Sequence, residues 1–313
     1  MQEILSDIAL YRGLSMNKLE YQILQICKRN RDGSQATQSN RRRILAMCTK
    51  QLADAGFKVN KINISDLKGR HIDALLNRWR SDGISTGAIK NRLSALRWLA
   101  EKVGDEGLVK SNDVLGIEKR QYIKNEDKGV TLSDFDISQL DKNTQLSLRL
   151  QAAFGLRRSE ALKFQISYAL GGYNIQNAEK IRLKASWTKG GRYREVPIAT
   201  DSQRQLLAEV ASFCQANDWQ SLIAPNLAYK EQLKCFEAQT SSIGLGNTHG
   251  LRHRYAQERY RRLSGMEPPV IAGQRRLTAS EREIDHKARM CLTEELGHGR
   301  KQITSQYLGS WGR

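Results

Sequence analysis

The chain has 313 residues, with 51 Lys+Arg against 33 Asp+Glu, which leaves a net charge of +18 at pH 7. At roughly 100–200 residues per domain this length predicts two domains, and well-mixed charges with a hydrophobic fraction of 39% argue against wholesale disorder. The sequence lacks any run of about 18 apolar residues and any secretory signal, and its five scattered cysteines form no C-x-x-C pair. We therefore expect a cytoplasmic protein with reduced cysteines and no membrane association.

The positive charge indicates the kind of partner. Residues 1–125 carry a net +10 and the remainder +8, so the excess is spread over both halves instead of being concentrated in a basic tail. A field of this size attracts polyanions, and nucleic acid is the most common polyanion inside cells. A merely soluble basic protein is the alternative that charge alone leaves open.

Four helices are predicted in the first third of the chain, over residues 17–30, 40–55, 65–82 and 85–103. Each segment places apolar residues at helical spacing, and most end at a glycine or an Asp-Gly pair. Amphipathic helices joined by short loops form a small bundle. Between residues 105 and 128 the apolar periodicity fades and charges alternate, which is typical of an interdomain linker.

The rest of the chain mixes helices with one hairpin. Residues 139–154 have a helical pattern, whereas 181–187 and 193–198 alternate apolar and polar residues around a Gly-Gly turn, which predicts a β-hairpin. From residue 202 onwards the pattern is again mainly helical. The predicted fold class is mainly α with a small antiparallel β-sheet. We expect a helical domain over 1–115, a linker over 116–130 and a second, α+β domain over 131–313.

Four short motifs are candidates for chemistry: GLRRSE (155–160), TKGGRYREVPI (188–198), HGLRH (249–253) and LGHGRKQITSQY (296–307). Taken singly, each also fits a structural role. His249 and His253 have the i, i+4 spacing of a zinc pair, but the residue after His249 is Gly250 where a metalloprotease would have Glu, and no third ligand is evident. No metal site is predicted.

Taken together, the motifs supply a set of side chains suited to a phosphodiester. Guanidinium groups match phosphate oxygens bidentately and can stabilise the charge that grows in a phosphoryl transition state. His249 and Arg252 are three residues apart and share one helix face. A tyrosine hydroxyl has a pKa of about 10, so it needs nearby cations to become a nucleophile. The sequence also lacks the paired acidic residues of a two-metal nuclease.

The four motifs, in this order, resemble those of the tyrosine recombinases, the phage integrase family. G-L-R-x-S-E matches Gly155–Glu160 and K-G-x-K-x-R-x-V-P matches the hairpin from Lys189 to Pro197, while H-x-L-R-H matches His249–His253. L-G-H followed by a tyrosine nine residues after the histidine matches Leu296–His298 and Tyr307. The catalytic residues implied by this resemblance are Arg157, Lys189, His249, Arg252, His298 and Tyr307, supported by Glu160 and His253. The first domain is similar to the family's core-binding domain in pattern and charge.

The resemblance implies a site-specific recombinase of an integrase-like mobile element, with two domains that close around double-stranded DNA. Tyr307 would form a 3′-phosphotyrosyl bond without ATP, metal or other cofactor. Arg157, Arg252 and His298 would bind the phosphate oxygens, His249 would assist the proton of Tyr307, and Lys189 would protonate the leaving 5′-oxygen. A homo-tetramer on synapsed DNA is implied, with accessory DNA-bending or directionality proteins as further partners and the nucleoid as location.

Three departures from the family pattern stand out. Arg252 and His298 are 46 positions apart, longer than usual in the family, and the extra segment around 264–287 is either a tolerated surface loop or a contact with DNA or a neighbouring subunit. Only six residues follow Tyr307, whereas many relatives dock a longer tail on the adjacent subunit. The short stretch before the first predicted helix gives no sign of a separate arm-binding domain.

Candidate DNA contacts lie on the polar faces of the second and fourth predicted helices. They are Arg41, Arg42, Arg43, Lys90 and Arg92, for which a solvated charged face is the alternative interpretation. Two other functions are kept beside recombination. One is a non-cleaving DNA-binding or regulatory protein with the same fold, and the other is a nicking-closing enzyme of the type IB topoisomerase kind.

Overall fold

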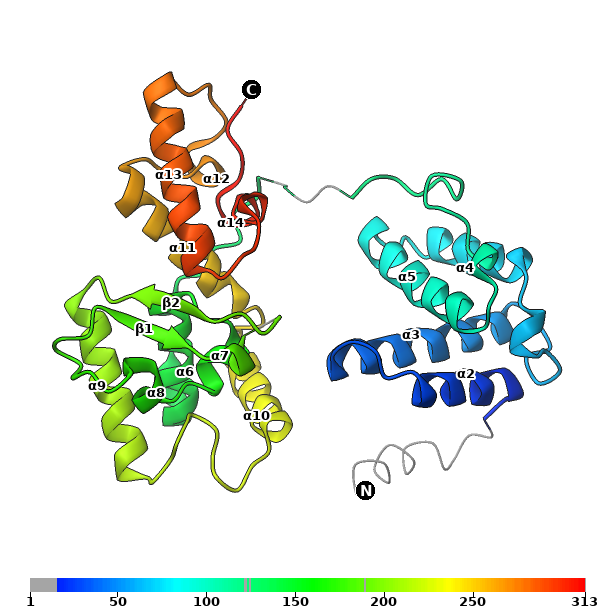
Figure 1. Cartoon of the computed structure of the whole chain (residues 1–313), viewed down its shortest axis with the longest axis horizontal. Coiled ribbons are helices and arrows are strands. Elements are labelled where there is room, and N and C mark those ends of the chain that lie inside the picture. The colour runs from blue at the N-terminus through cyan, green and yellow to red at the C-terminus, as the bar shows by residue number, and fades with distance from the viewer. Residues whose placement is uncertain (1–15, 121–122, 124, 189, 313) are drawn as a thin grey trace. The chain divides into compact units, whose positions relative to one another are not determined.

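The computed structural model describes residues 16–120, 123, 125–188 and 190–312, and it divides into two compact units, Met1–Gln121 and Tyr122–Arg313 (Figure 1). The described residues are mainly helical, with one two-stranded antiparallel sheet, which confirms the predicted fold class. The point of division falls within the segment predicted as a linker. None of the helices in the described ranges is long and apolar enough to cross a bilayer.

The first unit is a helical bundle with its own apolar core, centred on residues such as Leu45, Trp79 and Leu99. Leu108, Val109 and Ile117 belong to the same core although their segment was predicted to lie in or beside a linker. The elements of this unit are α2 (Lys18–Arg29), α3 (Gln35–Asp54), η1 (Ile64–Asp66), α4 (Gly69–Ser81), α5 (Thr86–Lys102) and η2 (Glu106–Leu108).

Capping explains where these helices differ from the predicted ranges. Helix α3 begins five residues before the predicted start, because the side chain of Ser34 accepts the backbone N–H of Thr37 at 3.2 Å. The predicted start of the third helix at residue 65 is wrong: residues 65 and 66 belong to the 3₁₀ turn η1. The helix begins at Gly69 instead, where the His71 ring accepts the backbone N–H of Lys68 at 2.9 Å.

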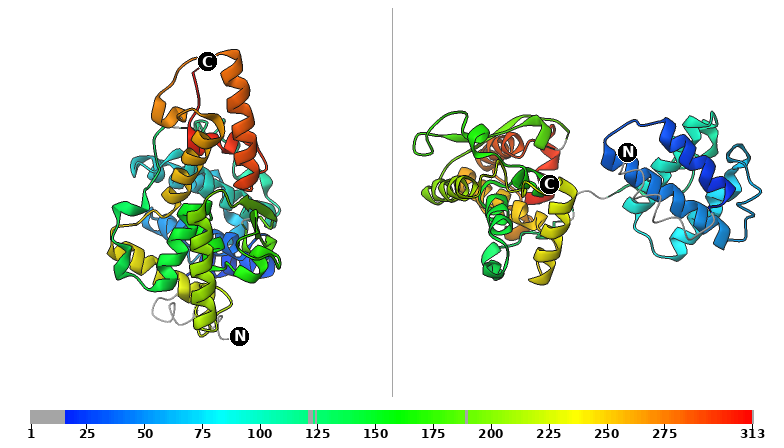
Figure 2. Two further views of the ribbon diagram at one scale, coloured as in Figure 1. Left: turned by 90° about the vertical axis from the view of Figure 1, so that its left-hand side faces the viewer. Right: turned by 90° about the horizontal axis from the view of Figure 1, so that it is seen from below.

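The second unit places its helices around the short sheet and one main core (Figures 1 and 2). Its first half contains η3 (Leu132–Asp134), η4 (Ile137–Gln139), α6 (Lys142–Phe154), α7 (Arg158–Leu162), α8 (Ile166–Leu170), β1 (Lys180–Leu183), η5 (Ala185–Trp187), β2 (Arg194–Pro197) and α9 (Asp201–Ala216). Its second half contains α10 (Tyr229–Ser242), α11 (His249–Ser264), α12 (Pro269–Ala272), α13 (Ala279–Glu295), η6 (Lys301–Ile303) and α14 (Ser305–Leu308).

The predicted hairpin is present, but its first strand is shorter than expected. Strands β1 and β2 pair antiparallel, with Ile181 opposite Val196 and Leu183 opposite Arg194. Residues 185–187 form the 3₁₀ turn η5, because the Trp187 ring turns into the core and packs edge-on against Tyr168 at 5.3 Å. The strand pairing brings Arg194 to the buried face of the sheet.

Candidate active site

The first motif forms a turn that joins two helices. Gly155 caps the end of α6 with a left-handed φ of +60°, and a Cβ there would clash with the Tyr255 ring. Arg157 then caps the short helix α7, and the Glu160 carboxylate accepts both the backbone N–H of Arg157 at 2.7 Å and its guanidinium at 2.8 Å. The turn therefore fixes the arginine and the glutamate of the motif relative to each other.

Glu160 also pairs with an arginine of the hairpin. Arg194 donates from Nη1 and Nη2 to the two carboxylate oxygens at 2.8 and 2.7 Å, and both side chains are buried. Burial raises the pKa of Glu160, but the hydrogen bonds and charges of Arg194 and Arg157 outweigh it and lower this pKa to about 2. The carboxylate is therefore ionised at neutral pH and offsets one of the positive charges in the site.

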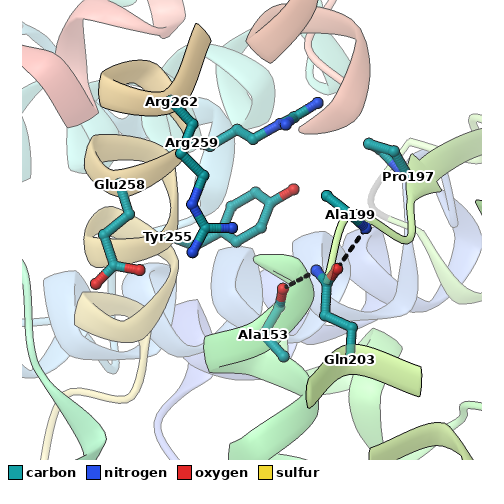
Figure 3. Close-up of a pocket in the computed structure, with 8 residues that line it drawn as sticks. All are labelled: Ala153, Pro197, Ala199, Gln203, Tyr255, Glu258, Arg259 and Arg262. Atoms are coloured by element: carbon teal, nitrogen blue, oxygen red, sulfur yellow. Dashed lines mark hydrogen bonds between the residues drawn. The ribbon is translucent and has the colours of Figure 1, made fainter. Parts of the chain in front are cut away.

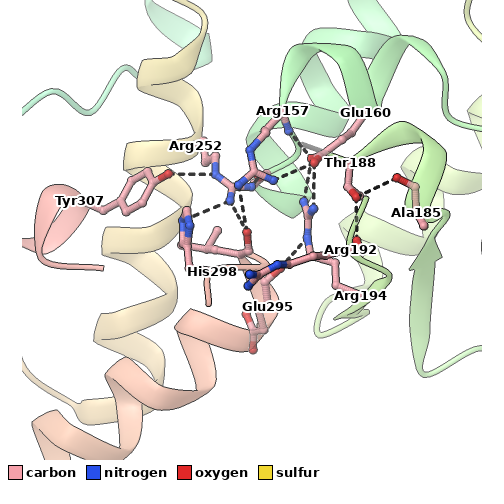
Figure 4. A network of polar contacts seen from close by, with 12 residues as sticks. Arg157, Glu160, Ala185, Thr188, Arg192, Arg194, Arg252, Glu295, His298 and Tyr307 are labelled. Carbon is pink, nitrogen blue, oxygen red and sulfur yellow. Dashed lines mark hydrogen bonds and ion pairs between the residues drawn. The ribbon is translucent and has the colours of Figure 1, made fainter. Parts of the chain in front are cut away.

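Three arginines converge on the C-terminal end of α13 (Figure 4). The carbonyl of Glu295 accepts Arg194 Nε at 2.9 Å, and the carbonyl of Leu296 accepts Arg252 Nη2 at 2.5 Å and Arg157 Nη2 at 3.5 Å. A helix C-terminus leaves carbonyls without intrahelical partners and carries partial negative charge, so it suits guanidinium groups. With one carboxylate among three guanidiniums, the cluster has a net charge of about +2 and is suited to bind an anion.

Arg252 is the most deeply buried of the three, with 1% of its surface exposed. It also donates to the carbonyl of Gly155, and its Nε lies 3.3 Å from the Tyr307 hydroxyl. Burial lowers the pKa of Arg252 to about 10, so the group still carries its charge at neutral pH. Arg252 therefore links the first motif, the end of α13 and the tyrosine.

Tyr307 lies on α14 with 5% of its surface exposed, and three histidines surround its ring. The ring centroids of His253, His298 and His249 lie 4.6, 5.5 and 6.0 Å from that of Tyr307. His249 and His253 come from consecutive turns of α11, next to Arg252, as the i, i+3, i+4 spacing predicts. The tyrosine hydroxyl therefore lies beside the guanidinium of Arg252, and three imidazole side chains lie close to the tyrosine ring.

Two of these histidines are neutral at pH 7. Burial lowers the pKa of His298 to about 3, with the charges of Arg252 and Arg157 adding to the effect, and Nε2 of His298 lies 3.5 Å from Arg252 Nη2. Burial also lowers the pKa of His253 to about 4, and its buried Nδ1 has no hydrogen-bond partner among the described residues. Neutral imidazoles can accept a proton or donate one N–H without adding charge to the arginine cluster.

Five of the six predicted catalytic residues, all but Lys189, come together in this unit, along with the supporting Glu160 and His253. Figure 4 shows Arg157, Arg252, His298 and Tyr307 of this set with Glu160. Lys189 lies outside the described residues. The neighbouring Thr188 donates its hydroxyl to the carbonyls of Arg192 at 2.7 Å and Ala185 at 3.0 Å. Among the described residues no three His, Cys, Asp or Glu side chains lie close enough to hold a metal ion.

Sequence reasoning gave no role to two side chains that support the site. Arg194 stands in the hairpin motif, and the alternation of the second strand puts it on the same face as the apolar Val196 and Ile198. Glu295 has no motif signal: its carboxylate accepts the hydroxyl of Tyr255 at 3.0 Å and pairs with Arg259 at 2.8 Å. These contacts fix the end of α13 on which the arginines converge.

A small pocket lies beside this support (Figure 3). Its volume is about 30 Å³, far below the roughly 300–1,000 Å³ of typical ligand pockets. Gln203 closes one side by donating to the Ala153 carbonyl at 2.7 Å and accepting the backbone N–H of Ala199 at 2.6 Å. Tyr255 and Arg259 line the other side.

In the first unit, the predicted DNA-contact residues differ in their exposure and in the contacts that their side chains make. The guanidinium of Arg41 stacks on Trp98 at 3.8 Å and lies 3.4 Å from Asp32, and that of Arg92 lies 5.1 Å from the Trp79 ring. Both side chains therefore contribute to the bundle itself. Arg43 is exposed and donates to the neighbouring Asn40 at 3.0 Å, whereas Arg42 and Lys90 are half-buried.

Comparison with known proteins is consistent with this arrangement. Residues 16–109 match the family model described as the N-terminal part of phage integrase, and residues 121–258 match the model described as integrase. The second match ends before His298 and Tyr307, so the assignment of these two residues rests on their own motif and on the geometry. None of the curated proteins matches the chain in sequence.

Three similar solved structures are DNA complexes of integrases or recombinases. A lambda integrase fragment in a dimer bound to a core site shares 15% identity with a TM-score of 0.58, covering 94% of this chain and 98% of that chain. A fragment of the Tn1549 transposon integrase bound to transposon right end DNA shares 12% identity with a TM-score of 0.53, covering 95% and 96%. The XerH site-specific recombinase bound to its difH substrate shares 17% identity with a TM-score of 0.55, covering 92% and 80%. These likenesses show a common fold, and the two family matches together span most of the chain: it belongs to the tyrosine recombinase, or phage integrase, family.

Proposed function

We propose that this recombinase cuts and rejoins double-stranded DNA at specific sites through a covalent bond to Tyr307. The observation that carries the proposal is the 3.3 Å contact between Arg252 Nε and the Tyr307 hydroxyl, within a cluster of three arginines. A guanidinium at this distance stabilises a phenolate, and the same cluster suits a pentavalent phosphorane-like transition state. The DNA complexes of the similar recombinases support a duplex as substrate.

In the proposed reaction the Tyr307 oxygen attacks the scissile phosphorus as the bond to the 5′-oxygen breaks. The phenolic proton leaves with help from His249, and Lys189 gives a proton to the departing 5′-oxygen. Arg157, Arg252 and His298 bind the non-bridging oxygens. One phosphate ester replaces another, so the reaction needs no ATP. Attack by a 5′-hydroxyl from a second duplex reverses the step and exchanges strands.

Glu160 has a positioning role in this proposal. A carboxylate next to a phosphate would be repulsive, but both oxygens of Glu160 are engaged by Arg194 and Arg157. The carboxylate therefore orients the two arginines and reduces their mutual repulsion. The assembly proposed for strand exchange is a homo-tetramer on synapsed DNA, with accessory DNA-bending or directionality proteins as additional partners and the nucleoid as location.

The test is trapping of the covalent intermediate. The protein is incubated with a pool of nicked duplexes of randomised sequence, so that cleavage near the nick releases a short strand and prevents rejoining. Wild type should form a protein–DNA adduct that survives denaturation, and Tyr307→Phe should form none. Tyr173→Phe, which changes an exposed tyrosine away from the motifs, is the matched control and should behave like wild type.

Two outcomes would overturn the proposal. Absence of adduct with wild type, in the presence of DNA binding, would favour the non-cleaving regulatory function. Relaxation of supercoiled plasmids irrespective of their sequence would favour the topoisomerase-like function.

A further inference from the structure

The segment that follows Tyr307 is held on one side by Asn125, which lies within the predicted linker. The Asn125 side-chain oxygen accepts the backbone N–H of Ser310 at 2.8 Å, and Asn125 is half-buried. The φ of Asn125 is +49°, a left-handed conformation that asparagine adopts more readily than most residues. A Cβ at Gly309 would lie 2.8 Å from this oxygen, so the glycine permits the close approach.

The same segment is held on its other side by α13. The indole N–H of Trp311 donates to Asp285 at 2.9 Å, and the Tyr260 hydroxyl donates to the same oxygen at 2.7 Å. Arg289 pairs with Asp285 at 2.8 Å and donates to the carbonyl of Gly309 at 3.2 Å. Asp285 is thus the centre of a small network that reaches the segment at two points.

The inserted segment before α13 also contacts the residues that follow Tyr307. The backbone N–H of Gly312 donates to the carbonyl of Arg275 at 3.2 Å, and the Arg275 guanidinium lies 5.1 Å from the centre of the Trp311 ring. The insertion therefore binds residues of its own chain, downstream of the tyrosine.

These contacts bear on the nucleophile because α14 cannot place it alone. The helix has four residues, far below the length at which a helix is stable in isolation. The 3.3 Å contact of the Tyr307 hydroxyl with Arg252 is a long one. The position of the ring must therefore depend on how the chain is fixed on both sides of it.

We propose that Asn125 and Asp285 are positioning residues for Tyr307, acting through Ser310 and Trp311. The inference rests on the proposed function of Tyr307. Neither residue belongs to the four motifs, and Asn125 falls in the stretch that the sequence predicts to be a linker. Together they hold the strand after α14 from two sides, so that the tyrosine hydroxyl stays beside Arg252.

A pair of variants at Asn125 separates its side chain from its backbone. Asn125→Gly keeps the left-handed backbone and removes the acceptor, whereas Asn125→Asp keeps both. At saturating protein, Asn125→Gly should form adduct about three- to tenfold more slowly than wild type, as expected for one lost hydrogen bond. The DNA concentration for half-saturation should stay unchanged, and Asn125→Asp should restore most of the rate. Trp311→Phe keeps an aromatic ring, although a smaller one, and removes the donor to Asp285, and it should slow the reaction in the same way.

Amide hydrogen exchange gives a readout that does not require activity. Residues 305–312 should exchange faster in Asn125→Gly than in wild type or Asn125→Asp, while α6 and α9 stay unchanged. Unaltered exchange over 305–312, an adduct rate equal to wild type, or a loss of rate that comes with weaker DNA binding and a lower Tm would each overturn the inference. Failure of wild type to form adduct would overturn the proposed function instead, and the exchange result would still decide this inference.

Discussion

Arg194 and Glu160 form a buried two-bond ion pair that joins the β-hairpin to the turn carrying Arg157. The two residues are 34 positions apart in the chain. Their pairing fixes the hairpin motif and the GLRRSE motif relative to each other, because residues of both bind the Glu160 carboxylate. Removal of Arg194 would leave the buried Glu160 carboxylate with Arg157 as its remaining charged partner, and breaking a buried ion pair typically costs about 3–5 kcal/mol.

Arg194→Met is therefore expected to lower the free energy of unfolding by about 3 kcal/mol or more, because Glu160 loses two charge-assisted hydrogen bonds. Denaturation in urea measures the change. The double variant Arg194→Met, Glu160→Gln should recover part of the loss, since no buried carboxylate is then left without the two hydrogen bonds of Arg194. A double variant less stable than the single one would contradict this account of the pair.

Gly155 is expected to be intolerant of a side chain for two separable reasons. Gly155→Ala should be destabilised both by its left-handed backbone, at about 1–2 kcal/mol, and by the clash of the new Cβ with the Tyr255 ring. Gly172→Ala is the control, because Gly172 has a φ of +85° with open space around it. The difference between the two variants in urea denaturation measures the clash, and equal losses would show that the contact is unimportant.

The buried neutral histidines predict a loss of stability in mild acid. The folded-state pKa values of His298 and His253, about 3 and 4, lie below the ordinary value of about 6.5. Between these limits the unfolded chain binds protons that the folded protein does not, so the stability present above pH 6.5 falls as the pH drops towards 4.

Urea midpoints at a series of pH values from 7.5 to about 4.5 test this, and His253→Gln should flatten the decline. His286 is exposed on α13 and serves as the matched control, because His286→Gln should leave the slope as in wild type. A decline of equal steepness in all three proteins would show that the buried histidines are not its cause.

The arginines of α3 are expected to act differently on DNA binding and on stability. Arg43→Gln, at an exposed position, should reduce the slope of log affinity against log salt by about one without lowering the stability. Arg41→Gln should lower the stability, because it removes the stacking on Trp98 and the contact with Asp32. Binding titrations over a range of salt concentrations and urea denaturation separate the two. An unchanged slope for Arg43→Gln would mean that its side chain does not contact phosphate.

The sequence predicted the structure correctly where both the residue types and their spacing indicate the same element. His249, Arg252 and His253 could be placed on one helix face, and the hairpin could be recognised from alternation and its Gly-Gly turn. The 3₁₀ turn at residues 185–187 could not be predicted. Trp187 continues the alternation of apolar and polar residues, but its packing against Tyr168 takes it out of the strand. Contacts with backbone atoms, such as that of Arg252 with the Leu296 carbonyl, cannot be predicted from residue types, because every residue has a backbone carbonyl. The same holds for Asn125, whose partner lies 185 residues away.

The arginines are held largely by the main-chain oxygens of Glu295 and Leu296, and this has a genetic consequence. No exchange of side chains at these two positions can delete an oxygen of the peptide bond. Misorientation of the guanidinium groups should instead arise from changes that shift where α13 ends, including insertions, deletions or proline substitutions in its last turn. Screens for inactive variants should accordingly find such lesions in the final turn of α13, at positions that a comparison of motifs would pass over.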